Sequence, residues 1–355
     1  MRDQKIALVL PAAGSINLGN EMICGATRTI LHRLPNQFEI EEFTFLWRPS
    51  SEELERINQC DKAIFVGTNI FQSHAAGWRW KSRDLEQVAV PYWLYGVGYS
   101  GPIQNDTPRV CKETKELVDW SRKAAGLGVR DPHTLRWLMG FRVRSELIGC
   151  PVLAYTDTFS DISSGEGEPV IAVRQLLLHN PSKKVASAQC AMVEWFFREY
   201  PNGIGVVQET ADLNLLKGRS TVRDLDRIVK ALSEASFVLS TRLHTGMIAL
   251  ALGRPVVFLA HDTRVASFCE MMSLSSRRLN PEGIKEATVS INRIEQGDLA
   301  EFSPTISRIR YFRRRLEDFL AGAITQATYV DRTKTSMNKR GSRMKGYLNK
   351  LLGGP

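Results

Sequence analysis

Paired cysteines, long apolar runs and a dinucleotide fingerprint are all missing from this sequence. None of its six cysteines has a partner at the C-x-x-C spacing of zinc and redox sites. No segment approaches the roughly 18 apolar residues of a membrane-spanning helix, and the apolar run Lys5–Pro11 is too short for a signal peptide. We therefore expect reduced thiols, no metal site and a cytoplasmic protein.

Two further absences concern ligands. The loop after the first apolar strand has no G-x-G-x-x-G, so we predict no dinucleotide site and no other cofactor. The stretch 326–355 is rich in Lys and Arg, yet no aromatic stacking pattern is interleaved with the charge, and we expect no nucleic-acid partner. Such a basic tail is suited to peripheral contact with an anionic membrane at its inner face. A solvated tail is the alternative interpretation.

Charge and size set the class of protein. The 355 residues are 43% apolar and 24% charged, which is an ordinary globular balance, and the length favours two domains. The net charge of +9 favours anionic partners, such as phosphorylated metabolites, acidic glycans or an anionic membrane.

Strand and helix patterns alternate twice along the chain. Buried strands are predicted at 6–10, 63–69, 92–98, 128–131, 170–174, 203–208, 237–239 and 256–259, an exposed or edge strand at 38–43, and a short strand at 288–291. The polar, glycine-rich stretch Asp161–Pro169 divides the two runs. We predict an α/β protein with two doubly wound, Rossmann-like domains facing a cleft, covering residues 1–160 and 169–325 and followed by the tail 326–355.

The stretch 236–260 is the centre of the second run. A strand ends at Leu239, a helix begins near Leu243, and Arg242 and His244 stand at the junction. Free N–H groups and the helix dipole favour an anion at such a junction. A guanidinium suits a carboxylate or phosphate, and an imidazole can carry a proton near neutral pH. In the alternative interpretation Arg242 pairs with a structural carboxylate and His244 caps the helix.

Other candidates lie where predicted strands end, the rim at which open α/β sheets bind ligands. Asn69 ends the strand 63–69, Gly98 belongs to a glycine-rich turn, and Arg174 ends the strand that opens the second domain. Asn17 lies in the loop after the first strand. The two asparagines are candidates for orienting acceptor hydroxyls.

Several segments together resemble the polysaccharide pyruvyl transferase family. Ser240-Thr-Arg-Leu-His244 with the strand Gly253-Arg-Pro-Val-Val257 is similar to the family's Ser-x-Arg-Leu-His and Gly-x-Pro elements. The segments 17–21, 96–102 and 129–131 resemble its Asn-x-Gly-Asp-Glu loop, its glycine-rich turn and its Val-Arg-Asp element, in the same order. Asn20 replaces the usual Asp, and His261 and Arg264 replace the Tyr and Lys of the last segment, so the sequence departs from the family there.

The resemblance implies a GT-B-like fold with an acceptor side in the first domain and a donor side in the second. It implies transfer of pyruvate from phosphoenolpyruvate onto two hydroxyls of a glycan sugar, or of its lipid-linked oligosaccharide precursor, in cell-surface or exopolysaccharide biosynthesis. His244 would be the general acid or base and Arg242 would hold the donor's carboxylate or phosphate. Arg264 and Arg174 would assist, and Ser240, Gly98, Asn17 and Asn69 would line the substrate site. The alternatives are a GT-B nucleotide-sugar glycosyltransferase and a non-catalytic module that binds anionic glycans.

Overall fold

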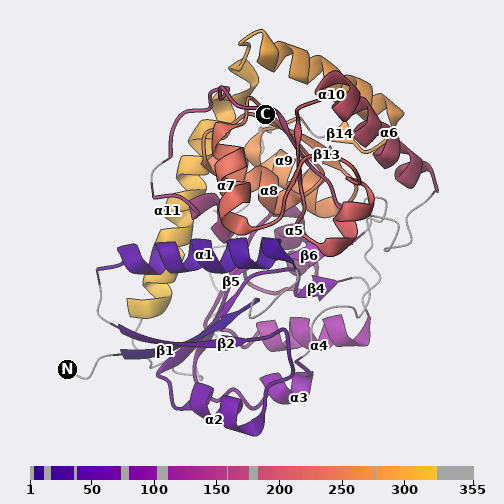
Figure 1. Cartoon of the computed structure of the whole chain (residues 1–355). Helices are drawn as coiled ribbons and strands as arrows, with labels where there is room; N and C mark the ends of the chain where they lie inside the picture. The colour runs from indigo at the N-terminus through magenta and orange to yellow at the C-terminus, as the bar shows by residue number, and fades with distance from the viewer. Residues whose placement is uncertain are drawn as a thin grey trace.

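The computed structural model describes residues 4–11, 17–35, 38–72, 80–101, 111–157, 159–175, 183–275 and 277–325. In these ranges the chain forms two six-stranded parallel sheets and a pair of short strands, β4 (Phe71–Gln72) and β6 (Tyr99–Ser100). One sheet comes from each half of the chain, so the predicted pair of doubly wound α/β units is present (Figure 1). The basic tail and the loop residues 12–16 lie outside the described ranges.

The first sheet has the strand order β2-β1-β3-β5-β7-β8. Its strands are β1 (Gln4–Leu10), β2 (Phe38–Thr44), β3 (Lys62–Val66), β5 (Tyr92–Val97), β7 (Gly126–Val129) and β8 (Glu146–Leu147). The alternating acidic and apolar residues of β2 match its place at the edge, where only one neighbouring strand pairs with it. The direction of winding changes between β1 and β3, because β2 is added on one side of β1 and β3 on the other, and this opens a crevice at their carboxyl ends.

The second sheet has the order β11-β10-β9-β12-β13-β14. Its strands are β9 (Val170–Ala172), β10 (Ile204–Val206), β11 (Thr221–Val222), β12 (Val238–Ser240), β13 (Val256–Ala260) and β14 (Arg277–Arg278). The direction of winding changes between β9 and β12, so the ends of these two strands form the second crevice. Arg174 and Arg242 follow these ends directly.

Helices flank both sheets. They are α1 (Leu18–Arg33), α2 (Ser51–Asn58), α3 (Ser82–Leu85), α4 (Lys112–Ser121), α5 (Pro132–Gly140), α6 (Lys183–Glu199), α7 (Leu225–Glu234), α8 (Leu243–Ala251), α9 (Thr263–Met272), α10 (Pro281–Glu295) and α11 (Ser303–Thr325), with 3-10 turns η1 (Pro151–Ala154), η3 (Thr210–Asn214) and η4 (Ala300–Phe302). The strand predicted at 288–291 is wrong, because these residues lie inside α10. The β-branched side chains of this stretch favour a strand, but the residues form part of a helix because α10 buries one apolar face.

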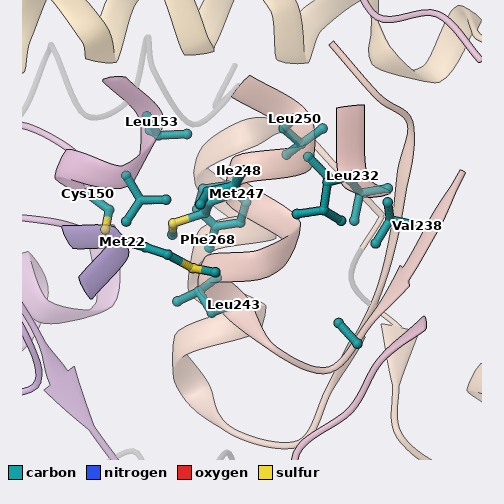
Figure 2. Packing of buried hydrophobic residues seen from close by; sticks show 14 of the residues in the cluster. Met22, Cys150, Leu153, Leu232, Val238, Leu243, Met247, Ile248, Leu250 and Phe268 are labelled. Carbon is teal, nitrogen blue, oxygen red and sulfur yellow. The ribbon is translucent and has the colours of Figure 1, made fainter. Parts of the chain in front are cut away.

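Helix α8 lies at the centre of the second half. All its residues except His244 are buried, as expected for a helix that is apolar all round. Its Met247 and Ile248 lie among Met22 of α1 and Phe268 of α9 (Figure 2). This packing holds the amino end of α8, and with it His244, in a fixed place.

Helix α11 connects the two halves. It begins beside α9 and runs past η1 to β5 of the first sheet (Figure 1). Near its end, the buried Nζ of Lys62 donates to the carbonyl oxygens of Ala323 and Ile324, at 2.9 and 2.6 Å. A cation at the carboxyl end of a helix is favoured by the helix dipole, so Lys62 fixes α11 on the first sheet.

Candidate active site

A cavity of about 400 Å³ lies where the carboxyl ends of the two sheets face each other. This volume falls within the range of small-molecule sites. Its lining residues are Asn17, Asn20, Phe45, Leu46, Thr68, Asn69 and Gln72 from the first half, and Arg174, Gln208, Glu209, Thr241, Arg242, Leu243, His244, His261, Arg264 and Val265 from the second. The cleft predicted between two domains is thus present, and it contains most of the predicted site residues.

The guanidinium of Arg242 is engaged on three sides by the protein. Its Nη2 donates to the Asp212 carboxylate, at 2.5 Å from Oδ1, its Nη1 to Glu209 Oε1 at 2.9 Å, and its Nε to the Val173 carbonyl at 3.2 Å. Arg242 and Asp212 are 5% and 0% exposed, so each charge is buried against the other. The structure therefore gives this guanidinium structural carboxylates as partners, which the sequence analysis kept as the alternative to a substrate anion.

Ser240 takes part in the same turn. Its hydroxyl donates to the Arg242 carbonyl at 2.7 Å and accepts from the Arg242 N–H at 3.1 Å, and the side chain is fully buried. The prediction that Ser240 lines the substrate site does not agree with this position. Its hydroxyl shapes the bend between β12 and α8 instead.

His244 opens onto the cavity from the first turn of α8. Its Nε2 is buried and accepts or donates no hydrogen bond among the described residues. Burial lowers the pKa of the imidazole well below 6.5, and the positive charges of Arg130, Arg264 and Arg242 lower it further. The ring is therefore neutral at neutral pH, which suits a base more than an acid while no anion is bound.

Helix α1 brings its amino end against this ring. A Cβ atom at Gly19 would lie 2.7 Å from His244 Nδ1, so only glycine leaves room for the imidazole there. Asn17 caps α1 by accepting from the Gly19 N–H at 2.9 Å, and its Nδ2 donates to Glu209 Oε1 at 2.8 Å. Because Glu209 also accepts from Arg242, one carboxylate connects the two walls of the cavity.

Three helices begin at the cavity, and their amino ends differ. Asn17 caps α1, and Asp262 caps α9 by accepting from the N–H groups of Arg264 and Val265. Helix α8 has no side-chain cap, because Arg242 stands at its N-cap position and points its guanidinium elsewhere. The uncapped N–H groups and the dipole of α8 favour an anion beside His244.

Arg264 and His261 form the far side of the second-half wall. Arg264 Nε donates to Asp262 Oδ2 at 2.7 Å, and His261 Nε2 lies 3.3 Å from the same oxygen. Burial raises the pKa of the Asp262 carboxyl, but Arg264 and His261 outweigh it and hold that pKa well below 3.8. Asp262 therefore stays ionised and holds the Arg264 guanidinium at the cavity.

Arg174 lies where it was predicted, just past the end of β9, and lines the cavity. Burial lowers the pKa of its guanidinium to about 10, and the neighbouring charges of Arg264 and Arg242 contribute to the shift. The charges of Arg242 and Arg264 lie close enough to Arg174 to lower its pKa, so an anion at this wall would be attracted by Arg174.

Arg130 is the functional candidate that sequence reasoning missed. It is 2% exposed, its Nη2 donates to Asn69 Oδ1, and its Nε lies 3.4 Å from Asp131 Oδ2. A Cβ atom at Gly98 would collide with this guanidinium, so the glycine predicted for the substrate site makes room for Arg130. The segment 129–131 had been noted for its family resemblance, and a charged residue at a predicted strand end was the signal available.

The family model for polysaccharide pyruvyl transferase matches residues 17–263, well over half of the chain. The matched range begins at the cap of α1 and ends at the start of α9, so it includes every lining residue of the cavity except Arg264 and Val265. The chain belongs to the polysaccharide pyruvyl transferase family. It is accordingly a transferase. A comparison with curated proteins found no match.

Solved structures give the fold of this family member. Staphylococcus aureus MnaA, in a co-structure with UDP, aligns over 92% of this chain and 98% of its own with 12% identity and a TM-score of 0.55. The Neisseria meningitidis UDP-GlcNAc 2-epimerase bound to UDP-GlcNAc aligns over 91% of this chain and 100% of its own, with 10% identity and a TM-score of 0.56. A putative Listeria monocytogenes UDP-N-acetylglucosamine 2-epimerase aligns over 90% of this chain and 95% of its own, with 12% identity and a TM-score of 0.56. These likenesses show a GT-B-like arrangement of two Rossmann-like units, as the sequence implied.

Two absences in the described ranges concern metals and membranes. Within them, no three His, Cys, Asp or Glu side chains gather in a way that could hold a metal ion. No helix in the same ranges is both long and apolar enough to cross a bilayer.

Proposed function

We propose that this family member transfers pyruvate from phosphoenolpyruvate to two hydroxyls of a glycan sugar or its lipid-linked precursor, forming a cyclic ketal. The observation that carries the proposal is the uncapped amino end of α8, with His244 beside it, facing the cationic wall of a cavity. Phosphoenolpyruvate carries roughly three negative charges, and such a wall attracts an anion of that kind.

The donor fits the second-half wall. Its phosphate or carboxylate would take the N–H groups at the start of α8, and Arg264 and Arg174 would hold the remaining charge. Arg242 would act as a positioning residue, because Asp212 and Glu209 occupy its fork. This differs from the direct donor contact that the resemblance implied for Arg242.

His244 would move the protons. As a neutral imidazole it can accept a proton from a sugar hydroxyl as that oxygen attacks C2 of the donor. His244 would pass that proton to the donor's C3, which becomes the methyl group, and the C2–O bond to phosphate breaks. The second hydroxyl closes the ketal on C2, and its proton leaves with the phosphate as hydrogen phosphate. A bound trianion would offset the arginines that depress the imidazole's pKa, so donor binding would raise that pKa and let His244 return a proton.

The acceptor fits the first-half wall. Asn17, Thr68, Asn69 and Gln72 offer neutral donors and acceptors that match sugar hydroxyls. Phe45 and Leu46 add apolar surface beside them. A neutral sugar has nothing to gain from the arginine wall, which leaves that wall to the donor.

The test incubates the purified protein with phosphoenolpyruvate and glycan acceptors. We expect phosphate release that depends on both substrates, together with a new ketal methyl signal in proton NMR. The same acceptors are offered with UDP-sugars, because the solved structures of similar fold carry UDP or UDP-GlcNAc. Release of UDP with a new glycosidic bond, and no use of phosphoenolpyruvate, would establish the nucleotide-sugar alternative. Glycan binding with neither reaction would establish the non-catalytic module.

A further inference from the structure

A second imidazole lines the cavity besides that of His244. His261 follows directly on β13, whereas His244 lies in the first turn of α8, which follows β12. Strands β12 and β13 pair in parallel, with Ser240 opposite Phe258, so the two histidines come from neighbouring strand ends at one edge of the sheet. In the proposed reaction His244 carries the proton that goes to the donor's C3, which leaves His261 without a role.

The ring of His261 is buried and lacks hydrogen-bond partners. Its side chain is 7% exposed. Both Nδ1 and Nε2 are buried, and neither makes a hydrogen bond to any described residue. Buried polar atoms of side chains are nearly always hydrogen-bonded, because a donor or acceptor without a partner is destabilising. Among the described histidines, His244 is the only other one with such a nitrogen, and both rings line the same cavity, so a ligand in this cavity would complete both.

The Asp262 carboxylate lies on one side of this ring. Its Oδ2 is 3.3 Å from His261 Nε2 and accepts from Arg264 Nε at 2.7 Å. Its Oδ1 caps α9 by accepting from the Arg264 N–H at 3.0 Å, so the carboxylate is fixed in place. A carboxylate beside one nitrogen stabilises the positive charge that an imidazole gains when its other nitrogen takes a proton. Nδ1 is thus the nitrogen that remains for a substrate.

The shared carboxylate also fixes which part of the donor His261 would meet. Because His261 and Arg264 flank Asp262, they lie on the same side of the cavity, and the proposed function gives Arg264 to the charges of the donor. A proton has to reach the phosphate there, and an imidazole is well suited to transfer it near neutral pH. Tyrosine, which the family has at this position, also has a hydroxyl that can pass a proton.

We propose that His261 is a second catalytic acid–base residue of the pyruvyl transfer. After the C2–O bond to phosphate breaks, the second sugar hydroxyl bonds to C2. His261 takes the proton of that hydroxyl on Nδ1 and passes it to the released phosphate, which becomes hydrogen phosphate. The imidazole ends as it began, and nothing is oxidised or reduced. The inference rests on the proposed function for the reaction, and on the structure for the residue.

The experiment measures three products from the wild type and from His261→Gln. The substrates are phosphoenolpyruvate and the methyl β-glycosides of glucose, galactose, N-acetylglucosamine and N-acetylmannosamine. Phosphate is assayed directly, the ketal by its methyl signal in proton NMR, and free pyruvate by its reduction with lactate dehydrogenase. Glutamine can keep an N–H toward Asp262 but cannot carry a proton. His32→Gln, an exposed histidine in the last turn of α1, is the matched control and should give the wild-type products.

We expect ketal formation by His261→Gln to fall about 10²-fold, because one positioned acid–base group is lost. Phosphate release should fall less, because the first proton transfer still depends on His244. Water then attacks C2 in place of the second hydroxyl, and the open product breaks down to pyruvate and the glycoside. Free pyruvate should therefore approach the amount of phosphate released. His244→Ala should instead lose phosphate, ketal and pyruvate together.

Two results would overturn this role of His261 alone. One is a set of wild-type product amounts from His261→Gln, and the other is an equal fall of phosphate and ketal without free pyruvate, which indicates a structural loss only. If His261→Gln unfolds at a lower urea concentration than the wild type, the smaller His261→Asn repeats the measurement. The proposed function fails in a different way: a wild-type protein that forms no ketal overturns the reaction, and the role of His261 with it.

Discussion

The two walls of the cavity are built alike and carry opposite chemistry. Each is the crevice at the carboxyl ends of a doubly wound sheet, and each includes the start of a helix that follows a strand beside the switch point, α1 after β1 and α8 after β12. The second-half wall carries Arg174, Arg242 and Arg264, whereas the first-half wall offers asparagine, threonine and glutamine. Since the architecture is shared, the residues at the strand ends decide which substrate each wall takes.

The walls also differ in how their helix starts are used. The Asn17 side chain accepts from the Gly19 N–H at the amino end of α1, while α8 begins without a side-chain cap. A neutral substrate needs no positive charge at the first-half wall, whereas an anion at the second-half wall would be stabilised by the helix dipole of α8. Each prediction below removes, displaces or screens one of the groups that distinguish the two walls.

The largest effect is expected at His244. Changing His244→Ala should lower kcat by about 10²–10⁴-fold, because one positioned acid–base group is lost. Unfolding in urea should stay close to wild type, since the ring packs against the cavity and not within the core. The measurement is phosphate release at saturating phosphoenolpyruvate and acceptor. Turnover near the wild-type rate would show that His244 of the second-half wall is not the acid–base group of the reaction.

The next prediction distinguishes two roles of Arg242, which are pairing with the buried carboxylates and contacting the donor. Changing Arg242→Met leaves the buried carboxylate of Asp212 without its cation, and removing one partner of such a pair costs about 3–5 kcal/mol of the free energy of unfolding. Urea unfolding measures this loss. Arg198→Met is the control, because Arg198 is 71% exposed beside Glu199 and its pair should contribute less than about 1 kcal/mol.

The result for Arg242 has a clear opposite. If Arg242→Met unfolds at the wild-type urea concentration and only the KM for phosphoenolpyruvate rises, the guanidinium contacts the donor directly. That was the role implied by the family resemblance, and the hydrogen bonds to Asp212 and Glu209 argue against it.

Sequence patterns predicted the scaffold better than the partners of individual side chains. Apolar runs and polar turns located the sheets and the corner at Arg242, because a strand and helix bury their apolar faces in a regular period. Neither Asp212 nor Glu209 was predicted as a partner of Arg242, since they lie some thirty residues away in sequence and meet it only through the fold. Arg130 was missed for the same reason: its contact with Asn69 joins two strand ends of one sheet.

A smaller effect is expected where the walls touch. Changing Gly19→Ala places a methyl group 2.7 Å from His244 Nδ1 and displaces the imidazole. A misplacement of about 1 Å can cost about 10²-fold in rate, so kcat should fall by up to that factor while the KM for phosphoenolpyruvate changes little. Gly322→Ala is the control, because a methyl group there meets nothing within 4 Å. Equal kinetics for the two variants would show that α1 does not position the ring.

The smallest effect sharpens the contrast between the walls without changing any residue. Raising KCl from about 0.05 M to about 0.5 M shortens the distance over which charges act severalfold. The KM for phosphoenolpyruvate should then rise about fivefold, because its charges face an arginine wall. The KM for a neutral acceptor should stay within about twofold, because amides and hydroxyls attract it at short range only. Each KM is measured with the other substrate saturating. Equal salt dependence of both would mean that the charge of the second wall does not sort donor from acceptor, and the assignment of one substrate to each wall would have to be abandoned.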